Sequence, residues 1–125
     1  MTERKKSKIL IIEDEDTTAA VLSEFLELRG YEILWSKDGI DGLEKVFQVS
    51  PDLVLLDLMI PGMNGLDVLL EIKSKTQTQS IPVVVCSAVD RINGLDSWAK
   101  WGALAYLSKP FDLNEVFRTI HSALT

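Results

Sequence analysis

The sequence has little of what several classes of protein require. One cysteine, Cys86, among 125 residues excludes an intrachain disulfide framework and a cysteine zinc site. The apolar runs are short and interrupted, far below the roughly 20 residues that cross a bilayer. Residues 1–7 are polar, and no apolar segment of the kind found in signal peptides follows them before Glu13. We therefore expect a polar leader, a cytoplasmic location and no membrane partner.

Positive charge is also scarce. The chain has 13 lysine and arginine residues against 19 aspartate and glutamate residues, for a net charge of −6. Nonspecific nucleic-acid binding needs a basic surface, so direct nucleic-acid binding is not expected. The length suits one domain with a single well-buried core, and residues 1–125 show no linker, repeat or low-complexity segment.

Apolar runs alternate with amphipathic stretches five times along the chain. The apolar runs predict strands over residues 8–12, 31–35, 52–56, 82–86 and 103–107. Helices are predicted over residues 16–29, 38–49, about 65–75, within 90–101, and from 113 to the C-terminus. In the first helix, Asp16 is the expected cap, and Val21, Phe25 and Leu28 are expected to form the buried face.

Five successive strand–helix units with apolar strands predict an α/β fold with a parallel sheet covered on both faces. Right-handed crossovers favour a doubly wound (βα)5 sandwich with helices on both faces and strand order 2-1-3-4-5. That order places a switch point between the first and third strands. In such sheets, ligands bind beyond the carboxyl ends of the strands.

Chemically active side chains follow four of the predicted strands. They are Glu13 and Asp14 after the first strand, Asp57 after the third, Ser87 after the fourth and Lys109 after the fifth. Two carboxylates about 4 Å apart repel by about 4 kcal/mol at an effective dielectric constant of 20. A hard cation such as Mg²⁺ relieves this repulsion, and it also accepts phosphate oxygens as ligands. This set of residues therefore suits phosphoryl transfer to a carboxylate.

The same residues resemble the receiver domain of two-component response regulators, a CheY-like family. The matching elements span nearly the whole chain in the right order. They are Glu13-Asp14, the segment DLMIPGMNG with Asp57, Pro61 and Gly65, Ser87-Ala88, Gly102-Ala103, Tyr106 and Lys109-Pro110.

The resemblance implies a magnesium site and a phosphoacceptor. Asp57 would accept the phosphoryl group, and Asp14 and Asp57 would be direct Mg²⁺ ligands. The backbone carbonyl of Met59 would be a third ligand, and Glu13 would contact the ion through water. Mg²⁺ is then the only cofactor expected.

The resemblance also implies a switch. Ser87 would hydrogen-bond the phosphoryl group, Lys109 would pair with it, and Tyr106 would change rotamer. The Lys109-Pro110 bond would be cis, as in that family. Trp35, after the second strand, is expected to lie outside this rearrangement.

A phosphorylation-activated switch of a two-component or phosphorelay system is the function that follows from the resemblance. A histidine kinase or histidine phosphotransfer protein would supply the phosphoryl group. The domain would assist its own phosphorylation and slow dephosphorylation, without being an enzyme that turns over substrates. Its read-out face would be helix 4, strand 5 and helix 5, and its partner a downstream effector protein or effector domain. The resemblance also allows a homodimer formed on activation.

Two other functions compete with this one. A Mg²⁺-dependent phosphohydrolase of the haloacid-dehalogenase pattern needs a second aspartate two residues after the nucleophile, where this chain has Met59. A pseudo-receiver that only binds partners typically lacks an acid, the phosphoacceptor or the lysine, and this chain keeps all of them. Nucleotide-binding glycine motifs follow none of the predicted strands.

Overall fold

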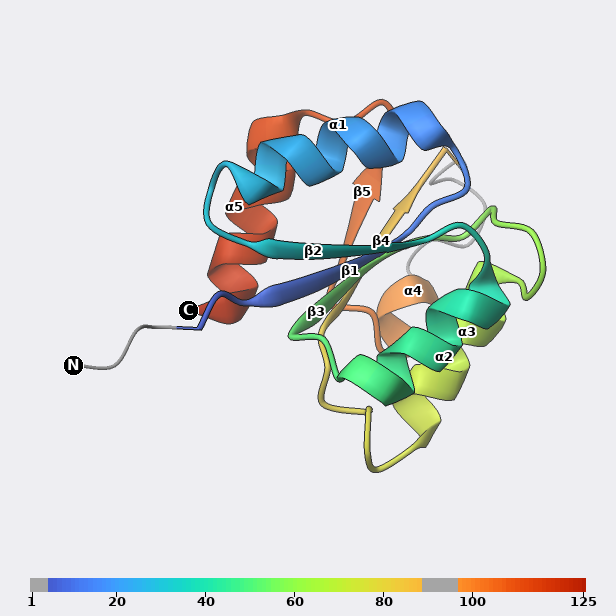
Figure 1. The fold of residues 1–125 in the computed structure, drawn as a ribbon. Coiled ribbons are helices and arrows are strands. Elements are labelled where there is room, and N and C mark those ends of the chain that lie inside the picture. Colours follow the sequence, from blue (N-terminus) through green and yellow to red (C-terminus); the bar gives the residue numbers. More distant parts are fainter. Residues whose placement is uncertain (1–4, 89–96) are drawn as a thin grey trace.

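The computed structural model describes residues 5–88 and 97–125, and its centre is a five-stranded parallel sheet (Figure 1). The strand order is β2-β1-β3-β4-β5, so the predicted doubly wound α/β fold and its order are confirmed. The strands are β1 (Lys8–Ile12), β2 (Glu32–Ser36), β3 (Leu53–Asp57), β4 (Val83–Ser87) and β5 (Ala105–Ser108).

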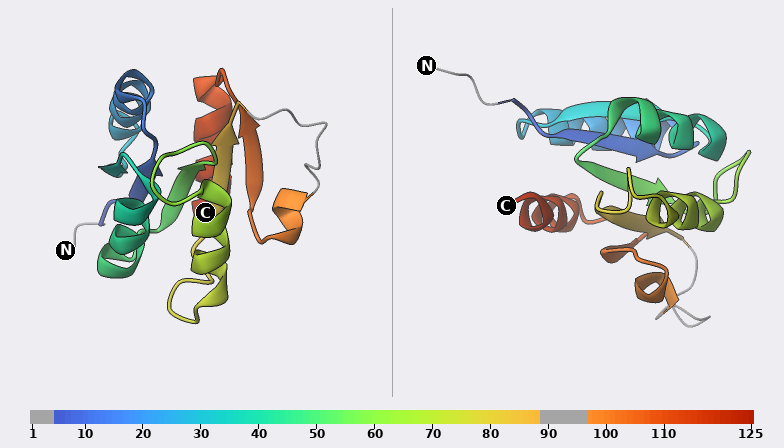
Figure 2. Two further views of the ribbon diagram at one scale, coloured as in Figure 1. Left: turned by 90° about the vertical axis from the view of Figure 1, so that its right-hand side faces the viewer. Right: turned by 90° about the horizontal axis from the view of Figure 1, so that it is seen from below.

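Helices cover both faces of the sheet (Figures 1 and 2). On one face lie α1 (Asp16–Glu27) and α5 (Leu113–Leu124), and on the other α2 (Gly39–Val49), α3 (Gly65–Ser74) and α4 (Ser97–Lys100). The strands are apolar on both sides because each side meets a helix layer. In β1, for example, Ile9 and Ile11 belong to the core under α1 and α5, whereas Leu10 and Ile12 belong to the core under α2 and α3.

Four of the five strands lie one or more residues later in the sequence than their apolar runs predict. Strands β2, β3, β4 and β5 end at Ser36, Asp57, Ser87 and Ser108, because the backbone ladder continues through the first polar residue. The sequence interpretation stopped at the last apolar side chain of each run. As a result, Asp57 and Ser87 are the terminal residues of their strands rather than the first residues of loops.

The predicted buried face of α1 is wrong at two of its three residues; the third, Phe25, packs against the core under α1 and α5. Val21 and Leu28 are 47% and 78% exposed, and the side chains that α1 buries are Ala19, Leu22 and Leu26. Apolar residues occupy two neighbouring rows of this helix, and the sequence alone does not distinguish between them. In the structure, the row that contains Ala19, Leu22 and Leu26 faces the sheet. The small side chain of Ala19 allows the helix to lie close to the sheet.

The helix starts differ in how well they were predicted. Asp38 and Asp112 cap α2 and α5, accepting hydrogen bonds from the backbone N–H groups of Asp41 at 2.8 Å and Asn114 at 2.9 Å. The expected cap Asp16 is instead the first residue of α1, after Glu15. The expected start of the fourth helix near Asp90 lies outside the described residues. Within residues 5–88 and 97–125, no helix is long and apolar enough to span a bilayer.

Candidate functional site

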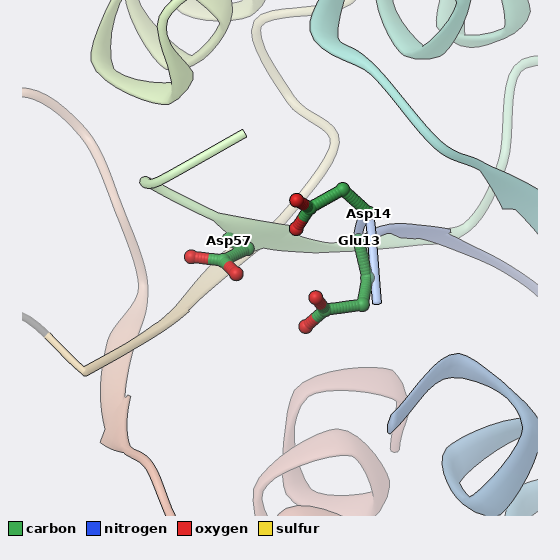
Figure 3. Close-up of side chains that lie close together, drawn as sticks. All are labelled: Glu13, Asp14 and Asp57. Atoms are coloured by element: carbon green, nitrogen blue, oxygen red, sulfur yellow. The ribbon is translucent and has the colours of Figure 1, made fainter. Parts of the chain in front are cut away.

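Three carboxylates meet at the carboxyl end of the sheet. Glu13 and Asp14 directly follow β1, and Asp57 ends β3, the strand beside it. One carboxylate oxygen from each residue lies within 4.8 Å of the other two, and Figure 3 shows the side chains around a shared space. The predicted switch point between β1 and β3 therefore brings these acids together.

Burial makes this group of acids costly without a positive partner. Glu13 and Asp57 are only 3% and 5% exposed, whereas Asp14 is exposed. Lys109, which follows β5, supplies the positive charge: its Nζ lies 2.6 Å from Glu13 Oε1 and 2.8 Å from Asp57 Oδ2. The predicted cis bond between Lys109 and Pro110 is present.

The carboxylates of Asp57 and Glu13 keep the Lys109 ammonium group positively charged. Burial alone would lower the pKa of the ammonium group, but the hydrogen bonds to Asp57 and Glu13 more than offset it and raise the pKa to about 12. Lys109 therefore stays positive throughout the physiological range. A permanent cation in contact with both buried acids is what a site that handles phosphate needs.

Backbone N–H groups hold the remaining oxygens of the two buried acids. The N–H of Met59 donates to Asp57 Oδ1 at 2.9 Å, and the N–H of Glu15 donates to Glu13 Oε2 at 3.1 Å. Each buried carboxylate thus has one oxygen on Lys109 and the other on the chain just after its own strand. Their orientations are therefore set before any ligand binds.

Ser87, the last residue of β4, lies beside Tyr106, which is inside β5. Ser87 is fully buried at the end of β4, and its backbone carbonyl accepts hydrogen bonds from the Lys109 N–H at 3.0 Å and the Tyr106 hydroxyl at 3.4 Å. Tyr106 is buried in the core under α2 and α3. The structure therefore brings together every predicted site residue; their individual roles stay predictions.

Two residues near the site were not among the predicted site residues. Trp35 donates its indole N–H to the backbone carbonyl of Glu13, and Gly39 donates its backbone N–H to the carbonyl of Pro61 in the loop after Asp57. Both residues lie at or just beyond the end of β2, which pairs with β1. The predicted strand order could therefore have placed them near the acids that follow β1. The direction of the Trp35 side chain could not be predicted from the strand order.

The donor set of the site fits a hard divalent cation. The converging groups are the carboxylate oxygens of Glu13, Asp14 and Asp57. Magnesium in proteins is typically held by one or two carboxylates, with water and phosphate oxygens completing its shell. The exposed Asp14 leaves an approach from solvent.

The buried Glu13 predicts a distinctive pH dependence of stability. Burial raises the pKa of Glu13 above its ordinary value of 4.5, and the hydrogen bond from Lys109 only partly opposes this. The folded chain then binds the Glu13 proton more tightly than the unfolded chain. The stability contributed by this group is complete below pH 4.5 and is lost as the pH rises through the raised pKa.

Replacing Glu13 with Gln should remove this loss, because an uncharged amide mimics the protonated acid. In Mg²⁺-free buffer, we expect the stability of Glu13→Gln relative to wild type to increase as the pH rises above 4.5. Denaturant unfolding over a pH series measures it, with Glu44→Gln, at an exposed position of α2, as the control. A relative stability that is flat or falls with pH would contradict the assignment.

The sequence was compared with protein families and with known proteins. The family model of the response regulator receiver domain matches residues 9–121. The chain is 37% identical over 121 residues to the DNA-binding dual master transcriptional regulator RpaA of Synechocystis, covering 94% of this chain and 48% of RpaA. It is 32% identical to Protein PilH of Pseudomonas aeruginosa, covering 94% of this chain and 98% of PilH.

Solved structures show the same fold. A response regulator from Chloroflexus aurantiacus superposes with a TM-score of 0.90 at 28% identity, covering 96% of this chain and 98% of that one. The chain spans about half the length of the first curated relatives it matches, and nearly all of PilH.

Proposed function

This chain belongs to the response regulator receiver domains of two-component signalling, and we propose that it is a switch turned on by phosphorylation of Asp57. The family is not an enzyme family in the usual sense. The phosphoryl donor would be a histidine kinase or a histidine phosphotransfer protein. The observation that carries the proposal is the convergence of Glu13, Asp14 and Asp57 within 4.8 Å, with Lys109 bonded to two of them.

Magnesium would be held by Asp14, Asp57 and the backbone carbonyl of Met59, with Glu13 contacting it through water. When bound, the ion would neutralise negative charge on the carboxylates and on the incoming phosphoryl oxygens. Asp14 suits a direct ligand because it is the exposed acid of the three.

In the transfer step, a carboxylate oxygen of Asp57 attacks phosphorus while the bond from phosphorus to the donor's imidazole nitrogen breaks. The electron pair of that bond returns to the imidazole. The Met59 N–H and Lys109 hold the carboxylate in one orientation, which favours in-line attack. Lys109 then pairs with the new phosphoryl oxygens, and the Ser87 hydroxyl donates to them.

The output follows from the added charge. A doubly charged phosphoryl group in place of a carboxylate biases an existing equilibrium between two conformations. Ser87 and Tyr106 are already in contact, so a shift of Ser87 towards the phosphoryl group would change the surroundings of Tyr106. The read-out face would be α4, β5 and α5, recognised by an effector protein, by an effector domain of a longer chain, or by a second copy.

A small-molecule phosphodonor tests the proposal without a kinase. We expect acetyl phosphate with Mg²⁺ to add one phosphoryl group, seen by intact mass, and chelation of Mg²⁺ to prevent it. Continuous hydrolysis of the donor without a stable adduct would indicate a phosphohydrolase instead. No reaction under any Mg²⁺ concentration would indicate a module that only binds partners.

A further inference from the structure

The backbone between Glu13 and Asp14 is held by a side chain from the edge strand. The Trp35 indole Nε1 donates a hydrogen bond of 2.7 Å to the Glu13 carbonyl oxygen. The ladder between β1 and β2 ends with Ile12 opposite Ser36, so this bond lies just beyond the last strand pair. It is a contact between a single side chain and the backbone of the acidic loop.

Both main-chain polar groups of Glu13 are bonded to the end of β2. Its N–H donates to the carbonyl of Ser36 at 3.0 Å, and its carbonyl accepts from the Trp35 indole. The N–H bond continues the pattern of the sheet, whereas the carbonyl bond depends on one side chain. Without the indole, the Glu13 carbonyl would lose the partner that sets its direction.

The direction of that carbonyl determines where Asp14 begins. The Glu13 carbonyl and the Asp14 nitrogen and Cα lie in one planar peptide unit. A rotation of this plane therefore swings the Asp14 side chain relative to Asp57. The side chain of Glu13 is held separately by Lys109 and by the Glu15 N–H, so Asp14 is the acid whose position depends most on the peptide.

Trp35 is itself held firmly enough to act as a support. Its backbone carbonyl accepts a hydrogen bond of 2.7 Å from Lys45 Nζ, which also pairs with Asp41 at 3.1 Å. The Lys37 ammonium lies 5.3 Å from the centre of the indole ring. The ring also packs against the core under α1 and α5. The indole thus has contacts on its face, on its edge and through its own backbone.

We infer that Trp35 is a positioning residue for the metal site: its indole N–H fixes the Glu13–Asp14 peptide and thereby directs Asp14 towards Asp57. This rests on the proposed function, since it concerns the proposed Mg²⁺ ligands. The expectation that Trp35 lies outside the switch rearrangement is separate from this role and stays a prediction. A tryptophan here does what phenylalanine cannot, because only the indole has a donor.

The test compares Trp35→Phe with Trp101→Phe by calorimetric titration of Mg²⁺. Both replace an indole with a ring that lacks the N–H, and Trp101 lies in the turn after α4, half-exposed and away from the acids. We expect Trp35→Phe to raise the Kd for Mg²⁺ by about threefold to tenfold, the factor that loss of one hydrogen bond corresponds to. Trp101→Phe should bind as wild type does.

The comparison separates positioning from general stability. A tryptophan with only a packing role would lower the unfolding midpoint and leave the Kd for Mg²⁺ of the folded protein unchanged. A Kd for Trp35→Phe no larger than that of Trp101→Phe would therefore overturn the inference while leaving the proposed function intact. Absence of Mg²⁺ binding by the wild-type protein would instead overturn the proposed metal site.

A measurement on the wild-type protein covers the case in which Trp35→Phe does not fold. The indole N–H resonance of Trp35, assigned through its ring protons, should shift during Mg²⁺ titration with the same midpoint as the calorimetric binding curve. A Trp35 resonance that does not move at saturating Mg²⁺ would overturn the inference.

Discussion

Asp57→Asn should reduce phosphoryl incorporation from acetyl phosphate to background while leaving the fold intact. The amide has nearly the same shape as the carboxylate, so it can still accept the hydrogen bond from the Met59 N–H. Lys109 keeps its contact with Glu13. The nucleophilic oxygen and one negative charge of the metal site are lost, so both the acceptor and part of the Mg²⁺ affinity disappear.

Intact mass after incubation with the donor and Mg²⁺ measures this loss, and circular dichroism checks the fold. Asp67→Asn is the matched control, since it makes the same chemical change at an exposed position in the first turn of α3. That variant should be phosphorylated as the wild type is. Incorporation by Asp57→Asn at the wild-type rate would show that another residue accepts the phosphoryl group.

Gly39→Ala should destabilise the protein by about 3 kcal/mol, the upper part of the usual range for overpacking a buried position. A β-carbon on Gly39 would lie 2.2 Å from the carbonyl oxygen of Met63. The obstacle is backbone, in the loop that joins Asp57 to α3, and Gly39 also donates its N–H to Pro61 in that loop. The loop therefore has to move away from α2.

Urea unfolding measures this loss, and Gly42→Ala provides the comparison within the same helix. A β-carbon at Gly42 would meet first the end of the Ile12 side chain, at 2.6 Å, which can shift more easily than a backbone carbonyl. We expect Gly42→Ala to cost about 1 kcal/mol, the lower end of the same range. Because Met59 lies in the displaced loop, Gly39→Ala should also weaken Mg²⁺ binding. A Gly39→Ala protein as stable as wild type would mean that the loop does not rest on α2.

The order of elements could be predicted because apolar periodicity reports which segments are buried. All five strands were expected close to where they lie, and the helix expected to begin at residue 38 is α2, which Asp38 caps. The buried face of α1 was predicted wrongly because two interpretations of its sequence had equal support. In α1, the row with Val21 and the row with Leu22 are both apolar, and only the packed sheet selects the second.

In the candidate site, too, some features could be predicted from the sequence and others could not. Asp57 and Glu13 could be placed together because parallel neighbouring strands end at a common edge, whatever the packing of their side chains. The bond from Lys109 to Glu13 joins residues 96 positions apart, and no local pattern reports where a long, flexible side chain ends. That Lys109 is shared between two buried acids became visible only in the folded chain.

The sequence by itself determined which chemical groups this protein gathers: three acids, a hydroxyl and a lysine at the carboxyl ends of parallel strands. Strand order and side-chain type are enough for that conclusion, because they depend on burial and chain connectivity. Only the tertiary structure decided how the groups are oriented, through contacts such as the Trp35 indole on the Glu13 carbonyl. Those contacts are set by the direction of individual side chains, which depends on neighbours that are distant in sequence.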